Sequence, residues 1–286
     1  MKNCIFLLFL LFLSLKIDGQ TQRFIYEYSF KPDSLNKENV IKEIMNLDIS
    51  DEGSTFYSNL LLDKDSIFMD QVEKGKISGN ITLDFRNIKK SQANFIISKK
   101  YPSLEITLHT SFNALNLAVK ENRILNWKIQ PEINIIEGFK VQKATTNFAG
   151  RNWIAWFAND IQLQDGPYKF CGLPGLILNI QDENGDFIFS IIGIRKKYSR
   201  TFINHFKLKE ITVTELKFNK LWNEYRSDPA KNIKQIHSSS EMAETIFYDS
   251  NTKSPLSKQD LIRNKEQGDR KYFKYYNNYI ERSLYK

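Results

Sequence analysis

The chain has 286 residues, of which 41% are hydrophobic and 13% aromatic, and a formal net charge of +8. This length and apolar content support one large β domain or two small ones with a sizeable core. The positive charge alone would fit binding to nucleic acid or to an anionic membrane surface. Because the lysines are scattered along the chain rather than gathered in one large cluster, we expect a solvated surface and no nucleic-acid partner.

The N-terminus has the pattern of a secretory signal. Lys2 precedes an apolar run of about eleven residues, Ile5 to Leu15, which is the length of a signal-peptide core and shorter than the ~18 residues of a spanning helix. We therefore expect residues 1–19 to be a signal peptide and the mature chain to have no transmembrane segment. The protein would then be exported, and would be periplasmic, extracellular or peripheral to the outer membrane.

The cysteines exclude a disulfide within the mature chain. Cys4 falls inside the predicted signal, which leaves Cys171 alone. Exported proteins often carry disulfides because their compartment is oxidising, so here we expect the core alone to provide the stability. We interpret Cys171 as a small buried hydrophobic residue.

Residues 20–213 mostly alternate between apolar and polar side chains, which is the period of β-strands. The predicted strands are, in chain order, FIYEYSF, STFYSNLLLD, SIFMDQV, NITLDFRNI, ANFIISKK, SLEITLHTSF, NRILNWKIQ, EGFKVQKATTNF, NWIAWFANDI, GLILNIQ and DFIFSIIGIRKK. Short strands separated by turn residues, without long helices between them, are typical of an antiparallel meander.

One short helix is expected inside this region, over residues 37–47, because Val40, Ile41, Ile44 and Leu47 have helical spacing. The predicted fold class is therefore mainly β, that is, a β-rich α+β fold. It consists of one large curved antiparallel meander sheet or a half-open barrel, with one or two covering helices and a C-terminal tail.

The last third of the chain changes character. The segment TELKFNKLWNEYR has apolar residues at helix-like spacing and is followed by Asp228–Pro229, which predicts a helix over residues 214–227. Residues 228–286 are expected to form a linker and then a tail. The tail is either weakly ordered or docked on the sheet through its aromatic run RKYFKYYNNYIERSLY.

A glycine- and proline-containing motif interrupts the strands near the single mature cysteine. Leu173-Pro174-Gly175-Leu176 fits a type II turn, because proline pre-sets φ at the second position and glycine accepts the positive φ of the third. Leu176, Leu178 and Ile180 would then line one face of a strand. We therefore assign a structural role to the whole motif, which comprises Gly172, Leu173, Pro174, Gly175, Leu176 and Ile177.

The strand before the motif is apolar on both faces. Trp153 and Phe157 point one way and Trp156 the other, so the strand should be covered on both sides by a helix, the tail or a ligand. The candidate ligand or partner surface comprises Trp153, Trp156, Phe157, Tyr168 and Phe170.

Two runs of this region, AxxxFxGRxWxAWF and GPYKFxGLPGLIL, resemble the GLPGLI family of exported Bacteroidetes proteins. The matching residues are Ala144, Phe148, Gly150, Arg151, Trp153, Ala155, Trp156, Phe157, Gly166, Pro167, Tyr168, Phe170 and Gly172 to Leu178. Tyr26-x-Tyr28 resembles the start of the family and Asn278-x-Ile280-Glu281 its close, so the resemblance covers most of the mature chain. Cys171 and Tyr279 depart from the usual pattern. The family is uncharacterised in function, so the resemblance implies secretion and transfers no catalytic residue.

Catalytic and metal-binding motifs are sparse. The three histidines, His109, His205 and His237, fall in different segments, which predicts no zinc site. The sequence has no phosphate-binding loop, dinucleotide fingerprint or nucleophile elbow, so no cofactor is expected. A set of acidic residues flanks the turns and is interpreted as turn chemistry rather than a calcium site: Asp160, Asp165, Asp182, Glu183 and Asp186.

These observations lead us to expect an exported, non-enzymatic envelope protein. It would bind a hydrophobic ligand, or a protein partner in the periplasm or outer membrane. One alternative is a secreted hydrolase that uses Cys171, for example with His109, or an acidic pair such as Asp84 with Glu105. A third is a structural or assembly module whose tail mediates contact.

Overall fold

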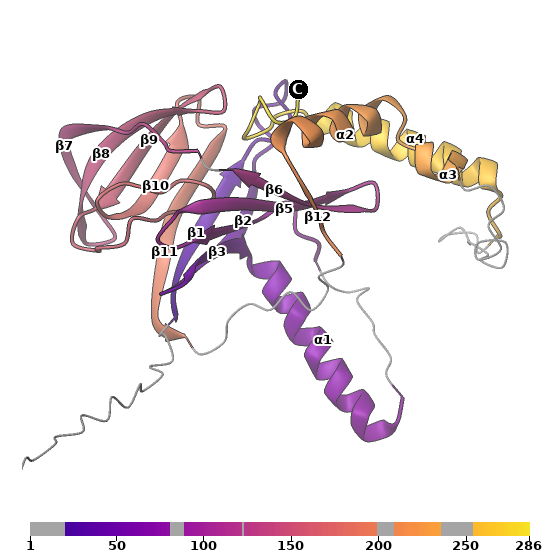
Figure 1. The fold of residues 1–286 in the computed structure, drawn as a ribbon, viewed down its shortest axis with the longest axis horizontal. Coiled ribbons are helices and arrows are strands. Elements are labelled where there is room, and N and C mark those ends of the chain that lie inside the picture. Colours follow the sequence, from indigo (N-terminus) through magenta and orange to yellow (C-terminus); the bar gives the residue numbers. More distant parts are fainter. Residues whose placement is uncertain (1–20, 81–88, 122, 199–208, 236–253) are drawn as a thin grey trace, which may run out of the picture.

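A computed structural model describes residues 21–80, 89–121, 123–198, 209–235 and 254–286. In these ranges one 12-stranded sheet dominates the fold, and four helices accompany it (Figure 1). The strands are β1 (Thr21–Phe30), β2 (Ile41–Ser50), β3 (Gly53–Ser58), β4 (Ile96–Lys100), β5 (Glu105–Phe112), β6 (Leu115–Glu121), β7 (Lys128–Ile136), β8 (Phe139–Phe148), β9 (Arg151–Ala158), β10 (Leu176–Asp182), β11 (Phe187–Tyr198) and β12 (Ile211–Val213). The helices are α1 (Asn59–Ser78), α2 (Glu215–Ser227), α3 (Lys231–Gln235) and α4 (Lys258–Tyr275).

The sheet is built from two meanders. Its strand order is β12-β6-β5-β4-β3-β2-β1-β11-β10-β9-β8-β7, so β1 to β6 follow one another, β7 to β11 do the same, and β1 pairs with β11. The pairs are antiparallel except that of β12 with β6, which is parallel. The edge strands β12 and β7 are not paired with each other, so the sheet is open. The prediction of one large, mainly antiparallel sheet is confirmed.

The β1–β11 pair forms the centre of the core. Alternation along β1 buries Phe24, Tyr26 and Tyr28 on one face. Tyr28 lies opposite Phe189 of β11, and the two rings stack with their centroids 4.4 Å apart. Burying large aromatic side chains of this kind stabilises a fold by ~2–3 kcal/mol each, which lets the two meanders form one continuous core.

The helix predicted over residues 37–47 is wrong. Residues from Ile41 onward form β2, which lies between β1 and β3. The spacing of Val40 and Ile44 suggested a helix, but both are exposed, at 47% and 39%. The buried residues Met45 and Leu47 instead follow the strand period and face β1 and β3.

The two strands predicted from STFYSNLLLD and SIFMDQV are also wrong in part. The first ends at Ser58, and the rest forms helix α1, which projects from the sheet (Figure 1). The Ser58 hydroxyl caps the helix by accepting a hydrogen bond from the Leu60 amide at 3.2 Å, and Gly79 ends it with a φ of 80°. The apolar residues that suggested strands therefore lie on a helix.

Two further strand expectations differ from the structure, and one expected strand lies mostly outside the described residues. Strand β6, which follows a turn with positive φ at Asn113 and Ala114, was not expected. Most of the predicted strand NITLDFRNI, residues 81–88, lies outside the described residues, as does the predicted signal peptide. Pro131 lies within edge strand β7, where the register shifts between Ile129 and Ile133 because proline cannot donate to the ladder.

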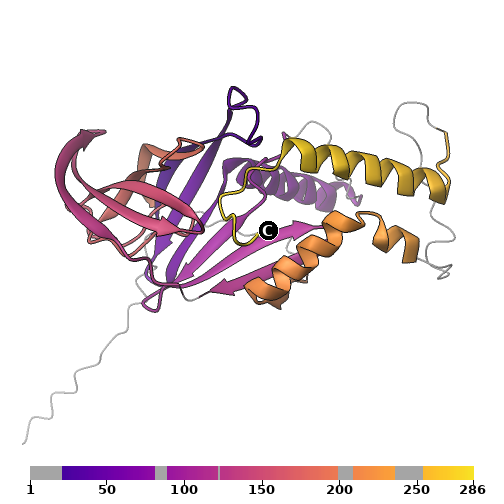
Figure 2. The same ribbon diagram turned by 90° about the horizontal axis from the view of Figure 1, so that it is seen from above.

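The C-terminal part folds back onto the sheet. Helix α2 covers the segment predicted as a helix, and the Thr214 side chain caps it by accepting from the Lys217 amide at 3.2 Å. Within the segment expected as linker and tail, α3 is followed by α4, which begins with a capping box of Ser257 and Asp260. The chain then runs back from α4 to end beside α2 (Figure 2), where the Asn219 amide donates to the Lys286 carbonyl at 2.8 Å.

Among the helices of the described residues, none combines the length and the apolar composition needed to cross a membrane. Cys171 is the one cysteine in the described ranges, and it is unpaired.

The predicted type II turn is wrong at its third position. Gly175 does not have a positive φ, whereas Gly172 has one of 89°. A glycine is nevertheless required at Gly175, because a Cβ there would lie 2.2 Å from the carbonyl oxygen of Ala158 in β9. The motif therefore depends on close backbone approach at Gly175 and on left-handed backbone at Gly172.

We predict that Gly175→Ala lowers the free energy of unfolding by at least about 3 kcal/mol, the upper end of overpacking costs, because the clash is with backbone. Gly172→Ala is the matched control, since a Cβ at that position would meet no atom within 4 Å beyond its chain neighbours, and should cost only about 1–2 kcal/mol of backbone strain. Urea unfolding of both variants checks this, and an equal or smaller loss for Gly175→Ala would contradict it.

Candidate functional site

A cavity of about 420 Å³ lies between the inner face of the sheet and the C-terminal segment. We call it the aromatic cavity. Its walls come from β1, β5, the loop before β4, helices α2 and α4, and the chain end. The lining residues are Tyr28, Phe30, Pro32, Ser91, Gln92, Ala93, Asn94, Phe95, Thr110, Ser111, Phe112, Tyr168, Phe187, Trp222, Tyr225, Asp269, Tyr272, Tyr276, Asn278, Tyr279, Ile280 and Tyr285.

The rings around the aromatic cavity support one another. Phe112 of β5 stacks on Tyr225 of α2 with centroids 5.4 Å apart, which joins the sheet to the helix. Tyr279 stacks on Tyr285 at 4.5 Å, and Trp222 meets Tyr285 edge-on at 5.1 Å. Offset-stacked and edge-on arrangements are the favourable ones, so the walls are pre-formed rather than collapsed onto the cavity.

Some of the polar groups in the walls are paired with one another. The Tyr276 hydroxyl donates to Gln92 Oε1 at 2.7 Å, and the Tyr225 hydroxyl donates to Asp269 at 2.8 Å. The indole Nε1 of Trp222 is buried and has no hydrogen-bond partner within the described residues. A buried donor without a partner costs about 1–3 kcal/mol, so Trp222 offers a hydrogen bond to an acceptor.

Three buried tyrosines of the cavity are neutral over the physiological range. Burial raises the pKa of Tyr28 and of Tyr168 well above the usual value, and raises that of Tyr279 to about 12. In each case the apolar surroundings penalise the phenolate. These three side chains therefore present hydroxyl groups and ring faces rather than negative charge.

Arg151 holds the C-terminal segment against the sheet. Its guanidinium donates to Asp182 of β10 at 2.8 Å, to Asn278 Oδ1 at 2.5 Å and to the Tyr279 carbonyl at 2.9 Å. The Arg151 and Asp182 side chains are 2% and 1% exposed. Asp182 also accepts hydrogen bonds from the amide of Phe187, so the pair is fixed on both sides.

Lys169 provides a second anchor. Its ammonium lies 2.5 Å from Glu281 of the C-terminal segment and 3.2 Å from Glu121 of β6. The Tyr168 hydroxyl also donates to Glu281, at 2.5 Å. One buried cation thus faces two buried carboxylates, and Tyr168 links this cluster to the aromatic cavity.

Burial shifts the titration of Glu121 upward. Its pKa is raised to about 7, chiefly because the side chain is buried; Glu215 and Glu281 also raise it, whereas Lys169 and Arg123 lower it. Because burial penalises the charged carboxylate, the cluster holds a proton on Glu121 below neutral pH.

A third buried pair fixes the loop that carries the GLPGLI motif. Lys99 of β4 and Asp165 are both fully buried, and the Lys99 ammonium binds the Asp165 carboxylate and the Gly166 carbonyl. The Tyr101 hydroxyl binds the other Asp165 oxygen. The Asp165 carbonyl accepts from the Ile177 amide at 3.0 Å, so one residue ties β4, the loop and the motif together.

Of the predicted ligand surface, Tyr168 lines the aromatic cavity and the other members do not. Trp153, Phe157 and Phe170 are fully buried, and Trp153 packs against Phe170 with centroids 4.5 Å apart. Trp156 points to the other face of β9 and is half-buried. In the motif, Leu173, Leu176 and Ile177 are buried, whereas Gly172 and Pro174 are exposed.

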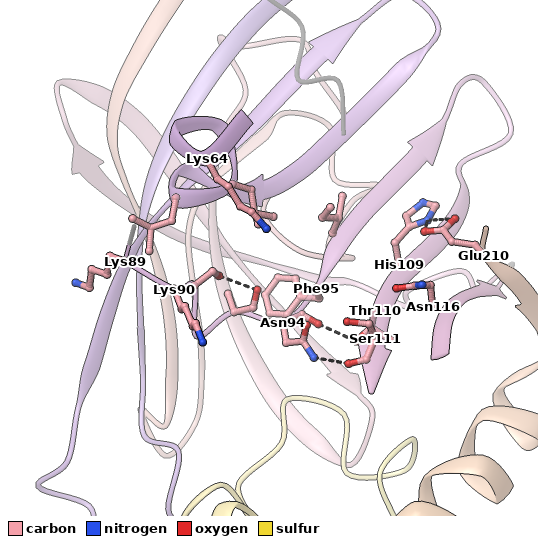
Figure 3. Close-up of a pocket in the computed structure, with 15 residues that line it drawn as sticks. Lys64, Lys89, Lys90, Asn94, Phe95, His109, Thr110, Ser111, Asn116 and Glu210 are labelled. Atoms are coloured by element: carbon pink, nitrogen blue, oxygen red, sulfur yellow. Dashed lines mark hydrogen bonds and ion pairs between the residues drawn. The ribbon is translucent and has the colours of Figure 1, made fainter. Parts of the chain in front are cut away.

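The hydrolase residues named from the sequence are not brought together. Cys171 is buried, and burial raises its pKa to about 11, which opposes formation of a thiolate nucleophile. His109 instead lies 3.0 Å from Glu210 (Figure 3). Its other ring nitrogen lies 2.9 Å from the Ser98 hydroxyl. Glu105 pairs with Lys120 at 3.1 Å, and Asp84 lies outside the described residues.

The turn acids do not form a metal site. Asp182 and Asp186 both lie near Arg151, at 2.8 and 3.7 Å. Within the described ranges, no three His, Cys, Asp or Glu side chains gather closely enough to hold a metal ion.

Sequence reasoning missed most of the cavity. Trp222 and Tyr225 lie on the predicted helix, and the run RKYFKYYNNY supplies Tyr272, Tyr276 and Tyr279. The density of aromatic residues in the tail was the available signal. The partners of these residues on β1 and β5 come from positions more than 100 residues earlier in the chain, so the sequence alone does not pair them.

The centre of the chain is similar to a family of unknown function. The model of a family described as "Protein of unknown function (Porph_ging)" matches residues 142–179, which run from β8 into β10. No curated protein matches the sequence.

Among solved structures, the chain is similar to PNGF-II, in a P21 crystal form with a TM-score of 0.50 and 15% identity, and in a C2 form with 0.48 and 15%. The matches cover 71% and 68% of this chain but only 33% and 31% of PNGF-II. The chain thus spans about a third of that protein, and the likeness concerns the fold alone.

We predict that Glu121 makes the protein less stable as the pH rises from about 4.5 to about 7. The folded state holds a proton on Glu121 up to about pH 7, against 4.5 for the unconstrained group, so this stabilisation is complete at low pH and is lost as the pH rises. In wild type this proton should make the free energy of unfolding fall by about 2 kcal/mol as the pH rises, and Glu121→Gln should remove that fall. Urea unfolding between pH 5 and 8 measures it. The exposed Glu137→Gln serves as the control, and identical slopes for wild type and Glu121→Gln would contradict the assignment.

Proposed function

We propose that the protein is an exported binding protein and that the aromatic cavity holds its ligand. The observation that carries this proposal is the cavity itself, about 420 Å³ of space walled by aromatic rings from the sheet and from the C-terminal segment. Pre-formed, mostly apolar cavities with few polar groups are the usual form of small-molecule sites. The ring walls favour a flat apolar or aromatic ligand, which can stack on them.

The charges of the lining support an uncharged ligand. Asp269 is the one charged residue among those that line the aromatic cavity in the described structure. Its carboxylate is already matched by the Tyr225 hydroxyl and by Lys265, whose ammonium lies 2.7 Å away. A charged ligand would lose hydration without gaining a counter-charge, so neutrality is favoured.

Trp222 adds a specific requirement. Its buried Nε1–H lacks a partner within the described residues, and a ligand carbonyl, ether or hydroxyl oxygen would satisfy it. We therefore propose a flat, neutral, mainly apolar molecule that carries at least one hydrogen-bond acceptor.

Export and an envelope location belong to the same proposal. Lys2 and the apolar run Ile5 to Leu15 support a secretory signal, and the resemblance to the GLPGLI family supports export as well. An apolar ligand is sparingly soluble in water, so a binding protein in the envelope would sequester it or pass it on. The cavity would serve this role by binding alone.

We predict that Tyr272→Ala weakens binding of the flat, neutral probe Nile red, whose ring carbonyl is a hydrogen-bond acceptor, about 10-fold, the upper range for loss of one ring contact. Tyr272 lines the aromatic cavity and is 42% exposed, so its removal should leave the fold intact. Fluorescence titration of the full chain measures the affinity.

Tyr275→Ala is the matched control, because Tyr275 lies on the same helix, is 46% exposed and does not line the cavity. Its affinity for the probe should equal that of the wild type. Equal weakening in both variants, or no binding by the wild type, would refute the cavity as the binding site.

A further inference from the structure

Ser98, His109 and the carboxylate of Glu210 form a hydrogen-bonded relay across three segments. Ser98 Oγ lies 2.9 Å from His109 Nε2, and His109 Nδ1 lies 3.0 Å from Glu210 Oε1. Ser98 comes from β4, His109 from β5, and Glu210 from the residue before β12. Figure 3 shows the His109 ring facing the Glu210 carboxylate.

The relay lies on the face of the sheet opposite the buried core. Along β4, Ile97 and Lys99 are buried on the inner face, where Lys99 binds Asp165. Ser98 lies between them and therefore points to the other face. His109 and Ser98 are both half-buried, so the hydroxyl is held in place without being sealed from solvent.

The hydrogen bonds define which atoms can react. The Glu210 carboxylate only accepts hydrogen bonds, so it fixes the proton of His109 on Nδ1. Nε2 then carries a lone pair and accepts the hydrogen bond of the Ser98 hydroxyl. A serine bound to a histidine base that is oriented by a carboxylate is the arrangement that makes a hydroxyl nucleophilic.

A groove of about 480 Å³ gives access to the relay. Thr55 and Thr107 lie directly opposite Ser98 on the two neighbouring strands, so their side chains flank it on the same face. Lys100 lies two residues along β4 and also lines the groove. The surroundings of Ser98 are therefore rich in hydroxyl groups, and the groove carries charges of both signs, among them Lys100 and Glu105.

We propose that this relay is a nucleophilic site that hydrolyses a small carboxylic ester of a polar alcohol. Ser98 Oγ would attack the ester carbonyl carbon while His109 Nε2 takes the hydroxyl proton. The ester C–O bond then breaks, and the proton passes from His109 to the departing alcohol. Water, deprotonated by His109, next attacks the acyl-Ser98 bond, which releases the carboxylic acid and restores Ser98.

The substrate class follows from the groups available to stabilise the oxyanion, which is the ester carbonyl oxygen after attack by Ser98 Oγ. The backbone amides of β4 are engaged in the ladders with β3 and β5, so the donors must be side chains: the hydroxyls of Thr55 and Thr107 and the ammonium of Lys100. These groups are mobile compared with backbone donors, and their stabilisation is correspondingly weaker. An ester, which has a good leaving group, suits such a site better than an amide.

A fluorophosphonate probe tests the proposal on the full chain. Ser98 Oγ would bond to phosphorus, fluoride would leave, and the proton would pass to His109. We expect peptide mass spectrometry to find the adduct on Ser98, and Ser98→Ala to abolish both the adduct and the hydrolysis of p-nitrophenyl acetate above the solution rate. His109→Gln should slow the labelling at least ~100-fold, the usual contribution of a positioned base.

Ser103→Ala is the matched control, because Ser103 lies in the turn between β4 and β5 and is exposed; it should label like the wild type. Glu210→Gln tests the positioning residue, and should slow labelling and move the midpoint of its pH profile to lower pH. The proposal is overturned if folded wild type gives no Ser98 adduct, or if the adduct forms equally in His109→Gln or in denatured protein.

Discussion

The buried contact between Arg151 and Asp182 is the interaction on which the rest of the site depends. Two nearly unexposed charges face each other at 2.8 Å, and Arg151 directs its remaining donors to Asn278 and to the Tyr279 carbonyl. Removing one partner of such a pair leaves an uncompensated buried charge, at a cost of about 3–5 kcal/mol. The buried guanidinium of Arg151 on β9 therefore holds the C-terminal segment firmly against the sheet. Without this contact the wall formed by Tyr279 and the residues after it would lose one of its two buried charged anchors.

The second anchor, Lys169 with Glu281, joins the same segment to the loop that carries the GLPGLI motif. Residues 150–151, 167–170 and 278–281 are far apart in the sequence and meet here in space. Together they form a docking site: a glycine-dependent loop and an arginine hold the chain end in place, and the aromatic cavity forms beside them.

The sequence predicts the sheet well because alternation reports directly on burial, as in Tyr26 and Tyr28. The prediction from the sequence fails where the spacing of the apolar residues fits both the helical and the strand period. Residues 41–47 have apolar spacing that fits both a helix and a strand, and pairing with β1 decides between them. The need for glycine at Gly175 could be predicted but its cause could not, since the constraint is the Ala158 carbonyl on a neighbouring strand. The cavity could not be predicted from the sequence for the same reason. Its walls bring β5 together with α2, which lies more than 100 residues later in the chain.

The most direct test of the account is native mass spectrometry of the full chain, purified without denaturation from the cells that naturally produce it, beside an Arg151→Lys variant purified in the same way. Lysine keeps the charge but cannot reproduce the several directed hydrogen bonds of the guanidinium, so the C-terminal wall should loosen. The account predicts a discrete added mass on the wild type that is released on unfolding and is depleted in the variant. A bare wild-type mass, or the same added mass on both proteins, would contradict it.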